Sequence, residues 1–235
     1  MSRKAVYCLD FDGVLCNSID ECLVTGYNAY FRKEINTPLQ VHRDFRDYFY
    51  KYRYFVRPAG EYYVLFHAYE AGIELDKQSF DRLKGAMAPE LDAYSNNFYE
   101  CRYLLKKKDI NHWLSLHKIY SQCKKFLNES NTSFYIITNK DLDSVKKLAS
   151  YHGFSDKIIK IYSKEISLEK KKLFERLFEE YYIDPLIHQI SFVDDNEDNL
   201  EEVQDLSLNL YHAFWGYCVG SKKFSAIRNL SELIS

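Results

Sequence analysis

The feature that most constrains this chain is a stretch near its amino terminus, Val6–Val14, in which an apolar run leads directly into acidic residues. Ala5–Leu9 have the composition of a buried parallel strand. Asp10 and Asp12 follow two positions apart, so on a continuing strand both side chains lie on one face. Carboxylates crowded at a core edge repel each other unless a positive group lies between them, and Gly13 lets the backbone bend away from a ligand. The stretch therefore predicts a site for a divalent cation and a phosphate, although the same pattern also occurs in surface turns and calcium loops.

The remainder of the chain alternates between strand and helix patterns. Further strands are predicted at residues 133–137, 157–162, 190–193 and 208–214. Helices are predicted from Trp113 to Leu127, at about 142–151, 169–182 and 199–206, and near Asn229. Strands that alternate with helices imply right-handed crossovers. The predicted fold class is therefore α/β, with a parallel sheet covered by helices on both faces.

A long stretch after the first strand lacks this alternation. Residues 19–105 have helical periodicity almost throughout. Many of the chain's 21 tyrosines and 16 phenylalanines lie between Tyr27 and Tyr103, which indicates aromatic packing there. A charged connection, 106–109, follows. We therefore predict two domains: an α/β core made of residues 1–18 and 106–235, and a helical domain, 19–105, inserted into it.

Composition and charge exclude several classes of protein. The net charge of −2 gives no electrostatic footprint for nucleic acid or an anionic membrane. No apolar run approaches the roughly 20 residues needed to span a bilayer, and the start of the sequence lacks a signal-peptide core, so a cytoplasmic location is expected. The six cysteines form no C-x-x-C pair and the seven histidines show no metal-ligand spacing, which argues against a zinc site and against disulfides. Reduced thiols are expected.

Polar residues follow three of the predicted strands at the point where each strand ends. They are Asp10 and Asp12, Thr138, and the pair Asp194 and Asp195. In open α/β sheets, ligands bind at the carboxyl ends of the strands, because loops and helix amino termini converge there. These side chains are therefore expected to meet at one edge of the sheet.

The segment Leu9–Ser18 resembles the first motif of the haloacid dehalogenase superfamily, most of whose members transfer phosphoryl groups through an aspartyl-phosphate. The resemblance implies a Rossmann-like parallel core. It also implies that Asp10 is the nucleophile and that Asp12 protonates the leaving oxygen and then activates water. Mg²⁺ would be held by Asp10, the main-chain carbonyl of Asp12 and an acid of the fourth motif, for which we assign Asp195 with Asp194 beside it.

Residues later in the chain match the other motifs of the family. Thr138 would donate its hydroxyl to the phosphate and Asn139 a main-chain amide. The expected lysine is assigned to Lys170, which lies in a first helical turn, where a cation opposes the helix dipole. Competing lysines are Lys164, Lys171 and Lys172. The fourth motif departs from the commoner pattern because Asn199 stands where a later acid aligns, which leaves the roles of Asn199 and Asp198 open. Trp215–Tyr217 resembles a stretch found after the fifth strand of relatives.

The helical insert resembles the C1-type cap of small-molecule phosphatases and phosphomutases of this superfamily, such as phosphoglycolate phosphatase. Arg53 and Arg57 are the candidate residues for selecting the leaving group, ahead of His42 and Arg46, because arginine suits a carboxylate or a second phosphate. Each could instead be a surface charge over aromatic packing.

The expected function is a Mg²⁺-dependent phosphatase of a small phosphorylated metabolite, acting as a monomer or homodimer. The alternatives are a phosphomutase of the same fold and a non-catalytic binding or regulatory module. A carbon–halogen hydrolase fits less well, since that chemistry in relatives lacks the second acid that Asp12 provides.

Overall fold

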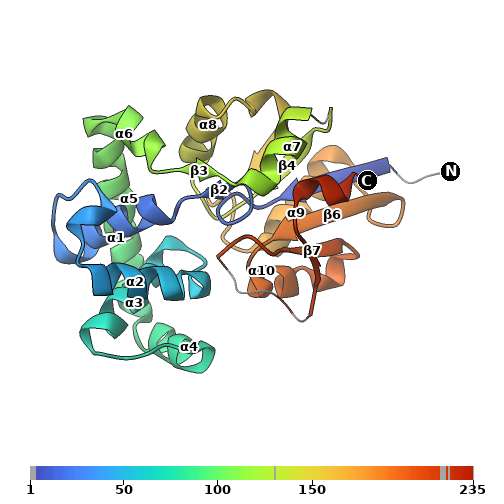
Figure 1. Ribbon diagram of the computed structural model, residues 1–235. Coiled ribbons are helices and arrows are strands. Elements are labelled where there is room, and N and C mark those ends of the chain that lie inside the picture. Colours follow the sequence, from blue (N-terminus) through green and yellow to red (C-terminus); the bar gives the residue numbers. More distant parts are fainter. Residues whose placement is uncertain (1–3, 130, 218–220, 222, 235) are drawn as a thin grey trace. The chain divides into compact units, whose positions relative to one another are not determined.

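The computed structural model describes residues 4–129, 131–217, 221 and 223–234 (Figure 1). The chain divides into two compact units, one formed by residues 1–17 and 118–235 and the other by residues 18–117. The second unit is the helical insert, and it continues to His117, beyond the predicted boundary at residue 105. We describe each unit by itself.

The first unit is built on a six-stranded sheet. Its strands are β1 (Lys4–Leu9), β4 (Phe134–Ile137), β5 (Ile158–Tyr162), β6 (His188–Asp194), β7 (Asn209–Ala213) and β8 (Ser225–Ile227). Their order is β5-β4-β1-β6-β7-β8, and every neighbouring pair is parallel. This confirms the predicted parallel α/β fold. β1 lies at the centre, and the carboxyl ends of the strands reach the same edge, where the predicted site residues begin.

Helices cover both faces of this sheet. They are α7 (Ser121–Glu129), α8 (Leu142–Tyr151), α9 (Lys170–Tyr181) and α10 (Glu197–Glu202). On one face, alternate side chains such as Cys8 and Phe192 pack against α9 and α10 in a buried cluster. On the other face, Phe126 of α7 contacts the rings of Tyr7 and Phe134. The strands are apolar on both faces because both are covered, which explains why their sequences read as unbroken apolar runs.

The connection between the units differs from the prediction. The helix predicted from Trp113 to Leu127 is two helices, α6 (Ile110–Ser115) and α7, separated by the short strand β3 (Lys118–Ile119). The strand β3 pairs antiparallel with β2 (Cys16–Asn17). The segment that leads into the insert and the segment that leaves it are therefore hydrogen-bonded to each other. The predicted closing helix near Asn229 is a short 3₁₀ helix, Leu230–Leu233. Short pairings such as β2–β3 leave no periodicity in the sequence, which is why the pattern did not predict them.

The second unit is helical, as its periodicity predicts. Its α-helices are α1 (Ile19–Phe31), α2 (Arg43–Tyr52), α3 (Tyr62–Glu70), α4 (Lys77–Ala86), α5 (Ala88–Lys108) and α6. Their shared core is aromatic, and rings such as Phe66 and Tyr94 each contact several others. Lys106–Lys108, predicted as a connection, form the last turn of α5, where cations interact favourably with the helix dipole.

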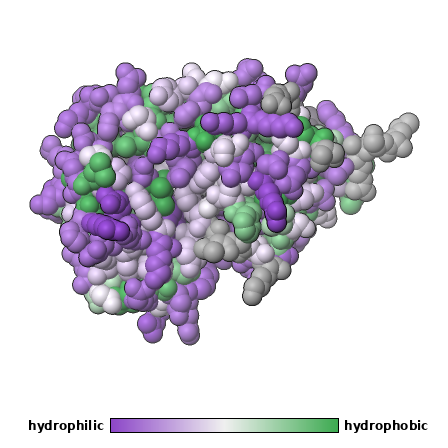
Figure 2. Space-filling model, viewed as in Figure 1, coloured by the Kyte–Doolittle hydropathy of each residue, from purple (hydrophilic) through white to green (hydrophobic). Residues whose placement is uncertain are grey.

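The surface shown in Figure 2 is mainly hydrophilic and the described cysteines are free thiols, as the composition predicts. On the face shown in Figure 2, hydrophilic side chains predominate and apolar ones lie in small groups. Among the described residues, no helix combines the length and the hydropathy that a membrane span requires. Cys8, Cys16, Cys22, Cys101 and Cys123 are free thiols, and Cys218 lies outside the described residues.

Candidate active site

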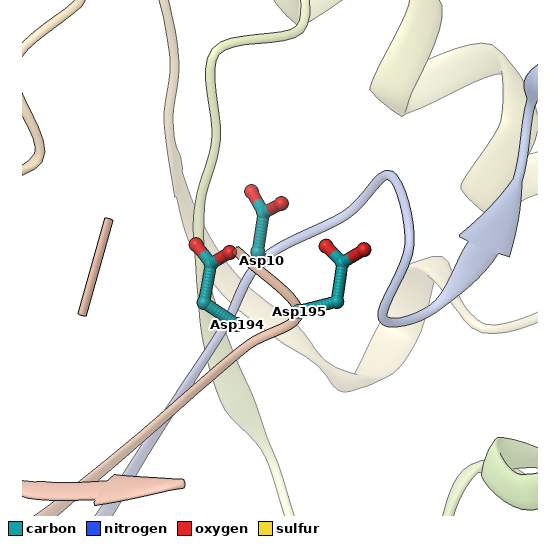
Figure 3. A group of neighbouring side chains, drawn as sticks. All are labelled: Asp10, Asp194 and Asp195. Carbon is teal, nitrogen blue, oxygen red and sulfur yellow. The ribbon is translucent and has the colours of Figure 1, made fainter. Parts of the chain in front are cut away.

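Three carboxylates converge at the carboxyl edge of the sheet. Asp10 directly follows β1, Asp194 ends β6 and Asp195 comes next in the chain. The parallel register, with Leu9 beside Val193, brings the two segments together, and the Asp10 amide donates to the Val193 carbonyl at 2.9 Å. One oxygen from each acid lies within 4.8 Å of the others, and all three residues are buried (Figure 3). This arrangement can hold a hard divalent cation on oxygen ligands.

Lys170 supplies the cation of this group. It is the first residue of α9 and is 1% exposed. Its Nζ donates to Asp10 Oδ1 at 2.7 Å and to the Ile137 carbonyl at 2.7 Å, and it lies 3.3 Å from Asp194 Oδ2. Burial alone would lower the pKa of Lys170, but attraction to Asp10 and Asp194 outweighs it and the pKa is raised. The ammonium therefore stays charged in the core.

The carboxyl of Asp10 titrates unusually. Burial raises its pKa to about 7, and the negative charges of Asp194 and Asp12 act in the same direction, against the attraction of Lys170. One lysine thus does not compensate the acids around it. A divalent cation would supply the missing positive charge and ionise Asp10.

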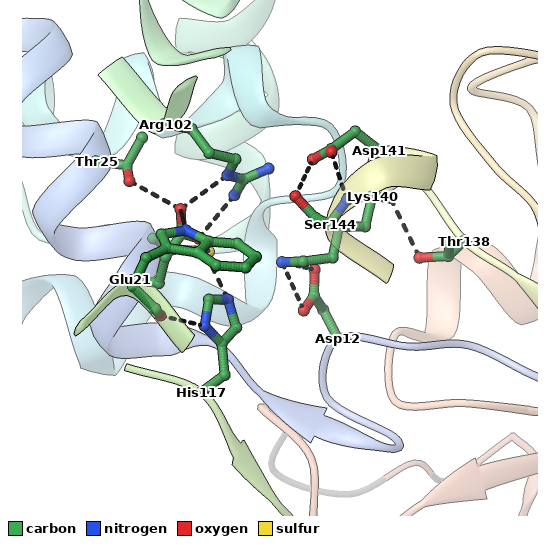
Figure 4. Close-up of polar contacts among 11 residues, drawn as sticks. Asp12, Glu21, Thr25, Arg102, His117, Thr138, Lys140, Asp141 and Ser144 are labelled. Atoms are coloured by element: carbon green, nitrogen blue, oxygen red, sulfur yellow. Dashed lines mark hydrogen bonds and ion pairs between the residues drawn. The ribbon is translucent and has the colours of Figure 1, made fainter. Parts of the chain in front are cut away.

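Asp12 faces a different partner. Both of its carboxylate oxygens lie 3.2 Å from Nζ of Lys140, whose side chain is 1% exposed (Figure 4). The Asp12 side chain is not a member of the three-acid group among the described residues, which fits the main-chain role that the resemblance gave it as a metal ligand. The sequence prediction missed Lys140. Its signal was its position directly after Thr138 and Asn139 at the end of β4.

Backbone geometry leaves space for the Asp195 side chain. A Cβ atom on Gly13 would lie 2.3 Å from Asp195 Oδ1, and one on Gly216 would lie 2.2 Å from Asp195 Cβ. Gly13 also has φ +88°, which residues with side chains rarely adopt. The carboxylate accepts the Tyr217 amide at 2.6 Å, and the Asp195 carbonyl lies 3.0 Å from His212 Nε2. The two glycines therefore fix where this acid can lie.

Thr138 and Asn139 lie at the end of β4, as expected. The Thr138 amide donates to the Tyr162 carbonyl of β5 at 2.8 Å, and its Oγ1 accepts the Lys140 amide at 3.2 Å. Within the part of the chain that the structure describes, the buried Oδ1 of Asn139 has no hydrogen-bond partner. The site edge thus contains a buried hydroxyl and an unused amide oxygen.

Solved structures share this architecture. The chain is 14% identical to a protein described as a predicted phosphoglycolate phosphatase from Haemophilus somnus, with all of this chain and 98% of that one covered and a TM-score of 0.67. A predicted phosphatase from Clostridium acetobutylicum is 13% identical, with 99% and 97% covered and a TM-score of 0.62. A haloacid dehalogenase-like hydrolase from Streptococcus pneumoniae is 16% identical, with 99% and 97% covered and a TM-score of 0.55. The chain has the haloacid dehalogenase-like fold. No protein-family model and no curated protein matches the sequence.

The departure of this chain from the commoner fourth motif of the haloacid dehalogenase-like fold has a structural explanation. Asn199 Nδ2 donates to both oxygens of Asp194, at 3.1 and 3.0 Å, and the Asn196 amide donates to Asp194 Oδ1 at 2.9 Å. An amide at position 199 therefore orients Asp194, whereas an acid there would repel it. The Asp198 amide donates to Asn196 Oδ1 in the first turn of α10.

Two of the three competing lysines form ion pairs outside the acid group. Lys171 pairs with Asp205, and Lys172 pairs with Glu169 at 2.6 Å. The structure thus brings Lys170 to the acids and pairs these two neighbours with other residues.

The candidate selectors lie in the helical insert. Arg53 is buried, donates to the Val56 carbonyl at 2.8 Å and lies over the Tyr62 ring at 5.1 Å. Arg57 is half-buried, and its amide donates to Glu61 Oε2 at 2.8 Å. Of the two residues ranked behind them, His42 lies 3.7 Å from Asp44 and Arg46 donates to the Pro38 carbonyl at 3.4 Å. The burial of Arg53 is thus explained by contacts inside the insert.

The insert contains a buried ionic group that the sequence prediction missed. Glu21 is fully buried and accepts hydrogen bonds from Arg102 Nε at 2.8 Å and Nη2 at 2.7 Å (Figure 4). Thr25 Oγ1 donates to it at 2.8 Å and Trp113 Nε1 at 3.3 Å. His117 Nε2 lies 3.9 Å from Glu21 Oε2. Arg102, Trp113 and His117 lie 81 or more positions from Glu21 in the sequence, so no local pattern reveals these contacts.

Proposed function

We propose that this protein hydrolyses phosphoric monoesters of small metabolites with Mg²⁺ bound by Asp10 and Asp195 and with Asp194 beside them. One observation carries the proposal: three buried acid oxygens lie within 4.8 Å of one another, and a single buried lysine lies against two of these acids. Such a group attracts a cation, and phosphoryl transfer needs mainly positioning and neutralisation of the phosphate oxygens. The haloacid dehalogenase-like fold supports the same conclusion as an analogy.

The proposed reaction uses the side chains in two steps. A carboxylate oxygen of Asp10 bonds to phosphorus while the bond from phosphorus to the leaving oxygen breaks, and Asp12 gives that oxygen a proton. Water then attacks phosphorus, Asp12 takes the proton of the water, and the bond to Asp10 breaks to release phosphate. Bound Mg²⁺ would neutralise charge on the phosphate oxygens. Lys170 holds Asp10 in place, and Lys140 orients Asp12.

Binding of the phosphate and choice of substrate fall to other residues in this proposal. The Thr138 hydroxyl and the Asn139 amide would bind the phosphate oxygens at the end of β4. The helical insert would act as the cap that excludes water, with Arg53 and Arg57 as candidate contacts to the leaving group.

The test is hydrolysis of p-nitrophenyl phosphate by the purified protein with Mg²⁺. We expect activity that disappears with a chelator and falls by about a thousandfold or more in Asp10→Asn. Asp156→Asn is the matched control, since Asp156 is an exposed acid in a 3₁₀ helix of the same unit, and it should retain full activity. A folded protein that is inert toward this compound and toward a panel of sugar, acid and nucleotide phosphates would contradict the proposal and favour a non-catalytic binding role.

A further inference from the structure

The helical insert contains a cavity of about 490 Å³ that none of the acid-cluster residues lines. Its walls come from the segment after α1, residues 33–36, and from the last two turns of α5, with Asn28 of α1 beside them. Its volume falls within the range of roughly 300–1,000 Å³ that is typical of small-molecule sites.

Hydrogen bonds hold the wall formed by residues 33–36 in place. The Asn28 side chain donates to the Ile35 carbonyl at 2.8 Å and accepts the Ile35 amide at 2.9 Å. The Asn36 amide donates to Gln40 Oε1 at 2.9 Å, and the Asn36 carbonyl lies 2.6 Å from His112 Nε2. The loop is thus held in place by α1, Gln40 and His112, so a ligand would not have to order it.

The cavity combines an apolar wall with a positive rim. Cys101, Leu104 and Leu105 supply apolar surface, and Leu104 is 53% exposed. Three lysines, Lys33, Lys107 and Lys108, and one acid, Glu34, also line it.

Among the residues that the structure describes, Lys33, Lys107 and Lys108 form no ion pair. By contrast, most charged side chains of the helices α4 and α9 form one. The dipole of α5 favours lysines in its last turn, but it does not account for Lys33, which lies in the facing loop. Three positive side chains and one acid leave a local excess of two positive charges in a chain whose net charge is −2.

We propose that this cavity binds a small anion that carries an apolar group, such as a carboxylate or phosphate on a hydrocarbon chain or ring. The apolar part would lie against Leu104 and Leu105, and the anionic group would lie between Lys33 and the two lysines of α5. The size of the cavity and its fixed loop favour a small molecule over a protein segment. The site is independent of the proposed phosphatase chemistry, because none of the residues that line it has a role in that reaction or in the proposed contacts to the leaving group.

The test uses 8-anilinonaphthalene-1-sulfonate as an anionic probe and N-phenyl-1-naphthylamine as its uncharged counterpart, with binding followed by fluorescence and calorimetry on the full chain. We expect one site for the anionic probe, at least about tenfold weaker binding of the uncharged one, and weaker binding as salt rises. Octanoate and octyl phosphate should displace the probe, and their relative strengths tell whether a carboxylate or a phosphate fits better.

Two pairs of adjacent lysines provide the decisive comparison. Lys107→Gln with Lys108→Gln should weaken binding of the anionic probe by about tenfold or more. Lys124→Gln with Lys125→Gln, an exposed pair on α7 of the other unit, should leave it unchanged. Leu104→Asp should abolish binding, and all these sites are exposed, so folding is retained.

Equal binding of the two probes, or equal losses in the two lysine pairs, would overturn the proposal. Displacement by a glutamate-rich peptide but not by octanoate or octyl phosphate would also overturn it, in favour of a protein partner.

Discussion

Two buried ionic groups, one in each unit, differ in how far the charge of their carboxylates is compensated. In the insert, the Glu21 carboxylate accepts two bonds from Arg102 and further bonds from Thr25 and Trp113, so charge and hydrogen bonds are both satisfied. In the α/β core, Lys170 pairs with two carboxylates, and Asp195 brings a third within 4.8 Å. The core group carries excess negative charge, and burial raises the pKa of Asp10 to about 7. A balanced group serves structure, whereas an unbalanced one has the charge to bind a cation.

The largest expected effect comes from removing the positively charged side chain of each group. Lys170→Met and Arg102→Met each leave buried carboxylates uncompensated, and each should lower the free energy of unfolding by about 3–5 kcal/mol in metal-free buffer. Mg²⁺ should restore much of the loss in Lys170→Met and none in Arg102→Met, because only the core group can bind it. Urea unfolding with and without Mg²⁺ measures both effects. Equal rescue of both variants would break the comparison.

Removing one negative charge should have opposite effects in the two groups. Glu21→Gln leaves Arg102 buried without its partner and should cost about 3 kcal/mol of stability. Asp10→Asn should instead stabilise the metal-free protein by about 1–3 kcal/mol at pH 8. The sign follows from the raised pKa: between about pH 4 and 7 the folded state keeps a proton on Asp10 that the unfolded chain releases. The stability penalty of Asp10 therefore grows across this range, so it is largest above pH 7 and smaller at pH 5. The free energy of unfolding of Glu21→Gln and of Asp10→Asn, measured at pH 5 and at pH 8, tests both expected signs. A loss of stability in Asp10→Asn at pH 8 would contradict the excess of negative charge in the core group.

A smaller effect is expected for Lys140. Lys140→Met removes the group that holds both oxygens of Asp12 and should lower kcat by about 10–100-fold with little change in KM. Lys140→Arg should recover part of the rate. Lys147→Met is the control, because Lys147 pairs with the exposed Asp143 and should leave the kinetics unchanged. Similar kcat values in Lys140→Met and Lys147→Met would remove Lys140 from the mechanism.

Binding of Mg²⁺ should depend on pH through Asp10. Since burial raises the pKa of Asp10 to about 7, the ion must displace a proton below that pH. The association constant should therefore rise about tenfold per pH unit from about pH 5 to 7 and level off above. Calorimetry in buffers of different ionisation enthalpy should show release of about one proton at pH 6. Asp10→Asn should bind Mg²⁺ more weakly and without this pH dependence.

The sequence predicted the parts of the fold and site that short patterns encode. The apolar runs that end in Asp10 and Asp194 identify central parallel strands, and the family motif on Leu9–Ser18 indicated the fold that the solved structures share. The position of Lys170 in the first turn of a helix, where a cation opposes the helix dipole, pointed to the lysine that the structure brings to Asp10.

The parts that the sequence did not predict depend on contacts between distant residues. Lys140 reaches Asp12 across 128 positions, and Arg102 reaches Glu21 across 81. Each is an ordinary charged residue of a loop or helix in the sequence, and only tertiary packing makes it a buried partner. The division of the helix predicted between Trp113 and Leu127 has the same cause, since the pairing of β3 with β2 decides it.

The central claim is that the acids at the sheet edge bind one divalent cation. Crystals soaked in Mn²⁺, with anomalous diffraction at the manganese edge, test it most directly. We predict a single strong peak at about 2.1 Å from a carboxylate oxygen of Asp10 and one of Asp195, with none beside Glu21. A fully soaked crystal with no peak between these two acids would contradict the account.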